Sequence, residues 1–521
     1  MEYIVKYHGD IRFMSVQIEI LSSSYAIAEL SAGEAEELLS FREIEYLEPA
    51  KKLLLSEDRG MDVSCITPVH QENGYHLTGA GVAVGIIDSG IDLSHPEFRN
   101  PDGSTRILSL WDMTADGTPP PGFYKGAEFQ GSDIDAGAAE SRDSVGHGTA
   151  VAGVAVGRSG AAPQASIVAV KLGDADSRTT DMMRGIKYVI HRAQQLGMPC
   201  VINLSYGSNN GSHRGQSLFE TFIDEMSRCW KTVIVCAAGN EGFGGHHFSG
   251  RLTSGGTVNA EFTVAYHRND LYLTLWKNFA DITAYELFLP GGQSTGRIIP
   301  ANRRAEISLG GVNITVEYDE PSHYTTAQEI YITLEEAGGH MEGLWTLSCY
   351  GDQVVDGRFD IWLPTIEEVT ERTSFLLPCI DMTMTLPASA VTPISVGGYR
   401  PDTDAVCPFS GRGGSVFESG VPQLDLTAPA ENIYSARSGG GYDVFTGTSM
   451  AAPFVTGAAA LLMEWGVVRG NDPFLYGQRI KAFLCKNAGR NSYLAYPNPL
   501  WGYGKLNLCA ALDDLMNYRR S

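Results

Sequence analysis

Apolar runs and helical stretches alternate along much of the chain from Gly81 onward. Four runs place apolar residues at successive positions, which is typical of strands buried on both faces: Val82–Ile87, Ile167–Val170, Val201–Leu204 and Val233–Cys236. Between them lie stretches of helical composition: His147–Val156, Thr180–Leu196 and Ser217–Cys229. This alternation predicts an α/β domain, a parallel sheet covered by helices on both faces.

The first fifty residues have a different pattern, which predicts strand, strand, helix and strand. The strand-like runs are Tyr3–Tyr7, Val16–Leu30 and Ile44–Pro49, and Glu34–Phe41 has helical composition. A polar segment near Ser56 to Met61 follows and can serve as a linker. We therefore expect a small α+β domain over residues 1–55.

The α/β pattern is interrupted between about residues 251 and 386. Short strand-like runs are separated there by turn clusters such as Pro290-Gly291-Gly292, and helix signals are scarce. We expect an inserted all-β domain, a sandwich or jelly roll, over this range. The α/β domain then comprises residues 56–250 and 387–521.

Composition and charge narrow the class of partner. Of the 521 residues, 43% are hydrophobic and 19% charged, an ordinary globular balance. The net charge is −23, from 61 acidic and 38 basic side chains. Nucleic-acid binding needs a basic face, so the balance argues against it.

Targeting signals are not evident in the sequence. The first residues lack the basic stretch and apolar core of a secretory signal, and no uninterrupted apolar run is long enough to span a membrane. The nine cysteines are scattered, odd in number and without a CxxC pair. This favours free thiols over a disulfide framework. We expect a protein that stays inside the cell or leaves it by a route the sequence does not show.

One short run, Gly447 to Pro453, indicates nucleophilic chemistry. Ser449 is flanked by small residues, and helix-forming sequence follows from Val455 to Trp465. Small neighbours let a substrate carbonyl approach the Ser449 hydroxyl, and a helix N-terminus supplies N–H groups for an oxyanion. On its own, the run is equally explained by a serine that caps a helix.

Two further segments supply a base and a carboxylate. Asp88 ends the buried strand at Ile86-Ile87, at the sheet edge where ligands gather in open α/β folds. His147 begins a helix of small residues, between Gly146 and Gly148. Taken singly, Asp88 can cap a turn and His147 a helix. Together with Ser449, they supply the nucleophile, base and orienting carboxylate of acyl transfer.

The three segments together resemble the subtilisin family of serine endopeptidases, which has the same order Asp, His, Ser. The resemblance implies that Asp88, His147 and Ser449 form the triad. A fourth segment, Ala237 to Gly242, places Asn240 at the family's oxyanion-hole asparagine. Ser205-Tyr206-Gly207 resembles the substrate-binding strand, and Leu172-Gly173-Asp174 resembles the opposite rim of the pocket.

Other segments resemble the clostridial germination-protease (Csp) branch of that family, among them Asp102–Ile107, Gly211–Gly215, Gly245-His246-His247 and Met463–Gly466. Some members of that branch keep the triad and activate the proenzyme of a spore-cortex hydrolase, and others have lost it and act in signalling. All three triad residues are present here. The resemblance therefore implies an active endopeptidase with a protein or peptide substrate, in a cytoplasmic or spore-associated location.

The resemblance also bears on cofactors and on the first domain. The family's calcium loop is replaced by Ala155–Pro163, which is short and has no Asp or Asn, and Glu97 stands where an aspartate usually joins that site. We expect no metal there and no cofactor. Residues 1–55 resemble a short propeptide, which implies an intramolecular inhibitor removed by self-cleavage between Pro49 and Ser64.

Two alternatives remain. The chain could be a non-catalytic signalling or interaction protein on the same fold. The insert could also be a carbohydrate-binding module that uses Tyr272, Trp276 and Trp345 for stacking, although such aromatics more often fill a core.

Overall fold

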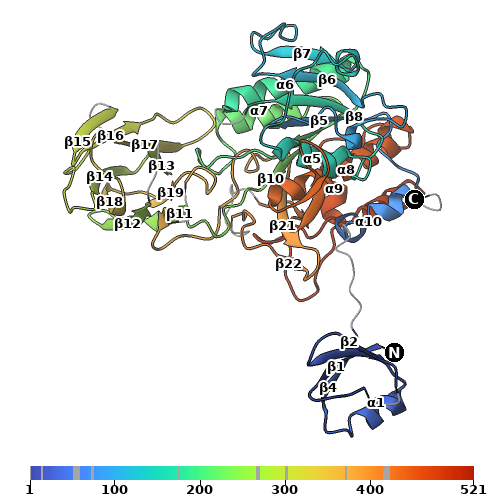
Figure 1. Cartoon of the computed structure of the whole chain (residues 1–521). Helices are drawn as coiled ribbons and strands as arrows, with labels where there is room; N and C mark the ends of the chain where they lie inside the picture. Colours follow the sequence, from blue (N-terminus) through green and yellow to red (C-terminus); the bar gives the residue numbers. More distant parts are fainter. Residues whose placement is uncertain are drawn as a thin grey trace. The chain divides into compact units, whose positions relative to one another are not determined.

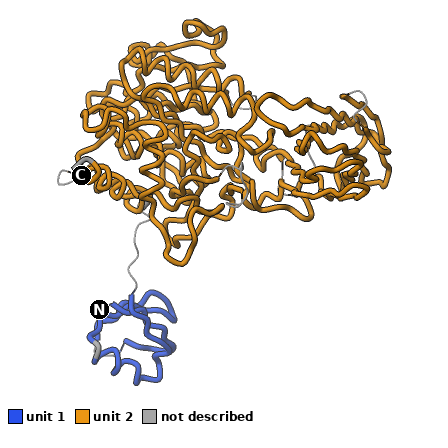
Figure 2. Tube along the Cα trace, turned by 180° about the vertical axis from the view of Figure 1, so that it is seen from behind, with its two compact units in different colours: residues 1–57 blue, residues 58–521 orange. Residues whose placement is uncertain are grey.

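The chain divides into two compact units, residues 1–57 and 58–521, coloured separately in Figure 2. The computed structural model describes residues 2–12, 16–50, 59–71, 75–173, 177–265, 270–299, 303–369, 372–414 and 423–520. The predicted linker and the self-cleavage region fall largely on residues 51–58, outside the described residues.

The first unit is a four-stranded antiparallel sheet with one described helix. Its elements are β1 (Glu2–Tyr7), β2 (Ile18–Ile20), β3 (Tyr25–Glu29), α1 (Ala32–Leu38) and β4 (Ile44–Pro49), with sheet order β2-β3-β1-β4. The single strand predicted over Val16–Leu30 is wrong, because a turn divides it. The Ser22 hydroxyl accepts hydrogen bonds from the Ser24 and Tyr25 N–H groups, which reverses the chain.

The second unit is built on a nine-stranded sheet. Its strands are β5 (Ala83–Asp88), β6 (Ile107–Asp112), β7 (Ala127–Gln130), β8 (Ser166–Lys171), β9 (Cys200–Leu204), β10 (Thr232–Ala237), β21 (Ile394–Arg400), β22 (Ala405–Val406) and β23 (Leu426–Pro429). Strands β23, β21, β10, β9, β5, β8 and β6 pair in parallel, and β7 and β22 add antiparallel edges. The parallel sheet predicted from the apolar runs is confirmed.

Helices cover both faces of this sheet (Figure 1). One core joins Val84 and Ile86 of β5 to α5 (His147–Val156), α8 (Thr448–Met463), α9 (Gln478–Lys486) and α10 (Leu508–Arg520). The other joins Ala83 and Ile87 to α6 (Thr179–Gln195) and α7 (Leu218–Ser227). Successive strand residues point to opposite faces, so an unbroken apolar run serves both cores.

Smaller elements complete the second unit: α2 (Arg59–Val63), α3 (Thr67–His70), η1 (Pro96–Phe98), α4 (Gly131–Asp135), β24 (Ile433–Ala436), β25 (Tyr442–Phe445) and η2 (Glu464–Val468). Helix α8 and η2 together are long and apolar enough to cross a membrane, but 89% of that stretch is buried in the protein. Such burial is typical of a core helix, so the stretch gives no support for a membrane span.

The inserted region forms two antiparallel sheets, seen at one end of the second unit in Figure 1. One sheet has the order β11-β19-β13-β17-β16-β15 and the other β14-β18-β12-β20. The strands are β11 (His247–Arg251), β12 (Thr257–Val264), β13 (Leu271–Asn278), β14 (Ile282–Phe288), β15 (Arg304–Leu309), β16 (Val312–Tyr318), β17 (Ala327–Glu336), β18 (Gly343–Gln353), β19 (Arg358–Trp362) and β20 (Ser374–Phe375). Side chains from both sheets share one core, so the predicted inserted all-β region is confirmed.

Of the three aromatic residues singled out in this region, Trp345 is a core residue and Tyr272 and Trp276 are half-buried. Trp345 has no exposed surface, so it cannot stack on a sugar. Trp276 is half-buried and packs against Trp362 and Met382. The ring of Tyr272 stacks on Tyr331 at 5.6 Å. These contacts favour the core assignment over a carbohydrate-binding surface.

The cysteine prediction needs correction. Cys65 and Cys509 form a disulfide, whereas the other seven cysteines are free. The two partners are 444 residues apart in the sequence, Cys65 after α2 and Cys509 in α10. No local spacing marks such a pair, because folding alone brings it together.

Candidate active site

Asp88 ends the strand β5 in the middle of the sheet and is almost fully buried, with 1% of its surface exposed. Its Oδ1 accepts a hydrogen bond from the Ser89 N–H and another from His147 Nδ1, each at 2.7 Å. A carboxylate held in this way fixes the imidazole orientation and its tautomer, with the proton on Nδ1. His147 Nε2 is then the nitrogen that can accept a proton.

His147 is the first residue of helix α5, and glycines on either side set its position. Gly146 has a φ of 84°, a left-handed conformation that favours glycine at the helix start. A Cβ added to Gly148 would lie 2.1 Å from the Gly90 carbonyl oxygen, so only glycine lets α5 approach β5 so closely. The sequence Gly-His-Gly therefore brings the imidazole to Asp88.

The side chain of Asp143 links the segment after β5 to the start of α5 through hydrogen bonds. Its Oδ1 accepts from the Gly146 N–H and the Ser89 hydroxyl, both at 2.8 Å. Its Oδ2 accepts from the Thr149 N–H at 2.9 Å and the Thr149 hydroxyl at 2.6 Å. One buried carboxylate thus joins the end of β5 to the first turn of α5. The sequence motif does not mark Asp143 as a functional residue, although it lies four positions before His147.

The charges around His147 favour its protonated form. Burial lowers the pKa of His147, but the Asp88, Asp143 and Glu367 carboxylates together raise it further than burial lowers it. The net result is a pKa above the ordinary value of 6.5. A histidine of this kind can take a proton from a neighbouring hydroxyl and hold it as an imidazolium.

Ser449 lies in the first turn of α8 and is half-buried. The preceding Gly447 has a φ of 150°, and a Cβ placed there would lie 3.1 Å from Ser449 Oγ and 3.5 Å from Asn240 Nδ2. The serine hydroxyl and the asparagine amide therefore flank one small space. In the first turn of α8, the Thr448 N–H donates to Asn240 Oδ1 and the Met450 N–H donates to the Gly447 carbonyl, each at 3.0 Å, so the Ser449 N–H is the candidate donor toward that space.

The proline in this helix has a local consequence. Pro453 has no N–H, so the carbonyl of Ser449, four residues earlier, lacks its usual helical partner. The Ser205 hydroxyl donates to that carbonyl instead, at 3.2 Å. Ser205 in turn accepts from Asn203 Nδ2 at 2.8 Å. The start of α8 is thereby tied to the end of β9.

Asn240 follows β10, and both ends of its side-chain amide are held. Its Oδ1 accepts from the Thr448 N–H at 3.0 Å and the Thr448 hydroxyl at 3.2 Å. Its Nδ2 donates to Glu367 Oε1 at 3.1 Å. The described residues contain no hydrogen bond between Ser449 and His147, a contact that often forms only in the substrate complex.

Comparison with known proteins assigns the family. The sequence model of the subtilase family matches residues 79–325 and 381–504, and the unmatched residues between them lie in the inserted β region. This chain belongs to the subtilase family. Its fold is subtilisin-like, with an added all-β region.

Individual relatives agree with this assignment. The CspB protease of Clostridium perfringens has a solved structure that is 35% identical, with a TM-score of 0.80, covering 89% of this chain and 98% of that one. Subtilisin E of Bacillus subtilis is 30% identical over 34% of this chain and 39% of its own length. The PIII-type proteinase of Lactococcus lactis is 24% identical over 78% of this chain, which spans only 23% of that proteinase.

The predicted substrate-binding residues of this subtilase lie close to His147 and Ser449. Ser205 directs its side chain to α8, as described above. The Tyr206 ring meets the His147 ring edge-on at 6.3 Å, and its hydroxyl donates to the Gly173 carbonyl at 3.4 Å. A Cβ on Gly207 would lie 2.3 Å from the Thr385 hydroxyl, so no larger residue fits there. Asp174 of the predicted rim lies outside the described residues.

Glu97, which the resemblance places at the family's calcium-site aspartate, has partners within the protein. Its Oε2 accepts from the Ser159 N–H at 2.9 Å, and its Oε1 accepts from the Tyr442 hydroxyl at 2.7 Å. The carboxylate therefore braces the short loop after α5. In the described part of the chain, no group of three or more His, Cys, Asp or Glu residues is arranged to hold a metal ion.

Proposed function

We propose that this subtilase is a serine endopeptidase that hydrolyses peptide bonds through an acyl-enzyme. In this proposal Ser449 is the nucleophile, His147 is the base, Asp88 orients the base and Asn240 stabilises the oxyanion. The observation that carries it is the 2.7 Å hydrogen bond from His147 Nδ1 to buried Asp88, because it leaves Nε2 as the proton acceptor.

The reaction follows from these roles. His147 Nε2 takes the hydroxyl proton as Ser449 Oγ attacks the scissile carbonyl carbon. The carbonyl oxygen gains negative charge and receives hydrogen bonds from Asn240 Nδ2 and the Ser449 N–H. His147 then gives its proton to the departing amine, which leaves Ser449 acylated. Water, deprotonated by His147, releases the new carboxylate, so no step calls for a cofactor.

Loss of the nucleophile tests the proposal. Ser449→Ala should abolish hydrolysis of an unfolded protein such as reduced casein, with a loss of roughly 10⁴-fold or more. The matched control is Ser322→Ala, which removes an exposed serine hydroxyl of the inserted region and should leave the rate unchanged. Equal hydrolysis by Ser449→Ala and the parent protein would reject the assignment.

We also propose that residues 1–55 are a propeptide, which inhibits the enzyme until it is cut away between Pro49 and Ser64. The compact first unit, Met1–Glu57, and the family membership support this proposal. Intact-mass analysis of the parent protein beside Ser449→Ala tests it. Identical full-length masses in the two preparations would reject self-processing.

The biological setting is part of the proposal. The net charge of −23 suits a protein or peptide substrate with basic surfaces, and not a nucleic acid. The resemblance of the sequence to the germination-protease branch motivates activation of a protein substrate in a cytoplasmic or spore-associated location. Fractionation of cells and spores, followed by immunodetection, tests the location. Peptide-library profiling of the processed enzyme identifies the cleavage preference.

The alternative is a non-catalytic signalling or interaction protein on the same fold. The intact set Asp88, His147, Ser449 and Asn240 disfavours it, since an interaction surface needs none of these contacts. Binding of a partner with equal affinity by the parent protein and Ser449→Ala, without hydrolysis by either, would favour this alternative.

A further inference from the structure

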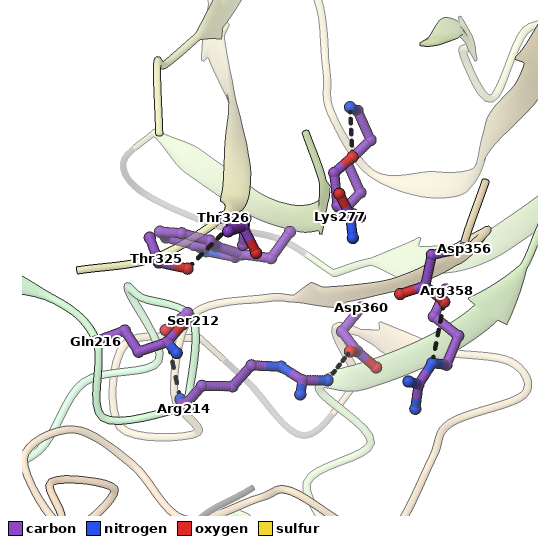
Figure 3. Close-up of a pocket in the computed structure, with 12 residues that line it drawn as sticks. Ser212, Arg214, Gln216, Lys277, Thr325, Thr326, Asp356, Arg358 and Asp360 are labelled. Atoms are coloured by element: carbon purple, nitrogen blue, oxygen red, sulfur yellow. Dashed lines mark hydrogen bonds and ion pairs between the residues drawn. The ribbon is translucent and has the colours of Figure 1, made fainter. Parts of the chain in front are cut away.

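The inserted β region is fixed to the catalytic part through a cluster of aromatic and charged side chains. Trp362, at the end of β19, lies between two imidazole rings, with centroids 4.2 Å from His213 and 4.6 Å from His247. Asp360, two residues earlier on the same strand, pairs with Arg214 at 3.3 Å (Figure 3). It also pairs with His247, at 3.1 Å. Because His213 and Arg214 belong to the segment between β9 and α7, strand β19 joins the two parts.

The segment that follows β19 makes a turn that contacts Glu241, the residue after Asn240. Residues 365–369 form this turn, in which the Thr365 N–H and hydroxyl both donate to Glu368 Oε2. The Ile366 N–H donates to Glu241 Oε1 at 2.8 Å. Glu241 is 2% exposed and follows Asn240 in the sequence. The turn is thus attached to the residue next to Asn240.

Glu367, at the tip of this turn, reaches Asn240 itself. Its Oε1 accepts a hydrogen bond from Asn240 Nδ2 at 3.1 Å, while Thr448 holds Asn240 Oδ1 at the other end of the amide. An amide nitrogen has two N–H groups, so one remains to stabilise an oxyanion. Held at both ends, the amide can neither flip nor rotate away from Ser449.

The Glu367 carboxylate also faces His147. It adds to the rise of the His147 pKa, together with Asp88 and Asp143, against the effect of burial. The Tyr206 ring also contacts the imidazole, edge-on at 6.3 Å between ring centroids. Glu367 is exposed to solvent, so its effect on the imidazole is smaller than that of buried Asp88.

We propose that Glu367 is a positioning residue, through which the inserted β region holds the Asn240 amide ready for the oxyanion. The inference rests on the proposed function, in which Asn240 is the oxyanion donor. Neither the triad motifs nor the family's oxyanion asparagine identifies such a contribution from the insert.

Three variants of the processed enzyme test the inference by steady-state kinetics on one peptide substrate. Glu367→Ala removes the acceptor and should lower kcat by roughly 3- to 30-fold with little change in KM, less than complete loss of the donor costs. Glu367→Gln keeps an acceptor oxygen and should recover most of the kcat. Glu335→Ala, an exposed glutamate at the end of β17, is the matched control.

A double mutant separates a positioning role from a purely structural one. If Glu367 acts through Asn240, then Glu367→Ala should have no further effect on kcat in an Asn240→Ala background. An equal loss in both backgrounds would overturn the inference, as would an unchanged kcat in Glu367→Ala. A rise in kcat would also overturn it, because the carboxylate would then obstruct the oxyanion site.

The pH profile adds a second readout. Both Glu367→Ala and Glu367→Gln remove a negative charge near His147, so the acid limb of kcat/KM should move down by a few tenths of a pH unit. Failure of the proposed function looks different. In that case, Ser449→Ala and Asn240→Ala would both keep the parental rate, whatever happens at Glu367.

Discussion

The parallel sheet and the inserted β region contribute differently to the proposed site. The sheet and its helices supply the reacting groups: Asp88 from β5, His147 from α5 and Ser449 from α8. The insert supplies Glu367, which accepts a hydrogen bond from the Asn240 amide and takes no part in bond making or breaking. Reacting groups gather at the carboxyl ends of parallel strands because strand ends and helix starts meet there. An added domain can influence such a reaction by positioning a residue of the site, as Glu367 does for Asn240.

The largest expected effect is on the sheet side of this comparison. Asp88→Asn should lower kcat roughly 10⁴-fold, because the amide no longer fixes the His147 tautomer or stabilises the imidazolium. Steady-state kinetics on a peptide substrate, with circular dichroism to verify folding, measures this. A loss below tenfold would show that Asp88 does not orient the base.

A smaller effect is expected where the two regions meet. Asn240→Ala should lower kcat by about 10²–10³-fold, the range seen when such a donor is removed from a subtilisin. The loss should appear in kcat with KM nearly unchanged, since the amide contacts charge that develops in the transition state. A change confined to KM would assign Asn240 to ground-state binding.

The smallest effect on catalysis is expected for His247→Asn, inside the insert, which should instead lower the stability of the fold. His247 places both ring nitrogens against oxygens, Nδ1 at 2.7 Å from the Asp381 carbonyl and Nε2 at 3.1 Å from Asp360. Both nitrogens therefore donate, and the ring is charged. Although burial lowers the pKa of His247, its hydrogen bonds to Asp360 and Cys379 raise the pKa to about 9.

The sign of the pH dependence follows from this raised pKa. The charged ring stabilises the fold fully below pH 6.5, its unfolded value, and the contribution disappears as pH rises through about 9. His247→Asn should cost about 3 kcal/mol below pH 6.5 and flatten the dependence between pH 6.5 and 9. Urea unfolding across that range measures both. Parallel curves for the variant and the parent would contradict the charged-ring assignment.

The sequence predicts the parallel sheet well, but it predicts poorly the contacts between the inserted β region and the rest of the second unit. The difference has a physical reason. Strands β5, β8, β9 and β10 are buried on both faces, so their apolar runs are visible without any knowledge of neighbours. Helix α5 has the predicted bounds because Gly146 and Gly157 mark its ends. The candidate residues of the site also lie in short continuous motifs, so the sequence alone identifies Asp88, His147, Ser449 and Asn240 as candidates.

Contacts between segments far apart in the sequence are marked by neither an apolar run nor a motif. Glu367 is one of many exposed glutamates, and tertiary contacts, among them the stacking of Trp362 and the bond from Ile366 to Glu241, bring it to Asn240. The disulfide between Cys65 and Cys509 is a similar case. The Ser205 hydroxyl likewise donates to a carbonyl that Pro453 leaves without a helical partner, a contact that no sequence pattern marks. Tertiary structure decides such roles.

The central claim is that His147, oriented by Asp88, activates Ser449. Its most direct test is the rate at which a fluorophosphonate modifies the processed enzyme between pH 5 and 9, with peptide mapping of the modified residue. The account predicts modification of Ser449 at a rate that follows one ionisation, with a midpoint above 6.5 because the His147 pKa is raised. Absence of label on Ser449, or a rate that does not change with pH across this range, would contradict it.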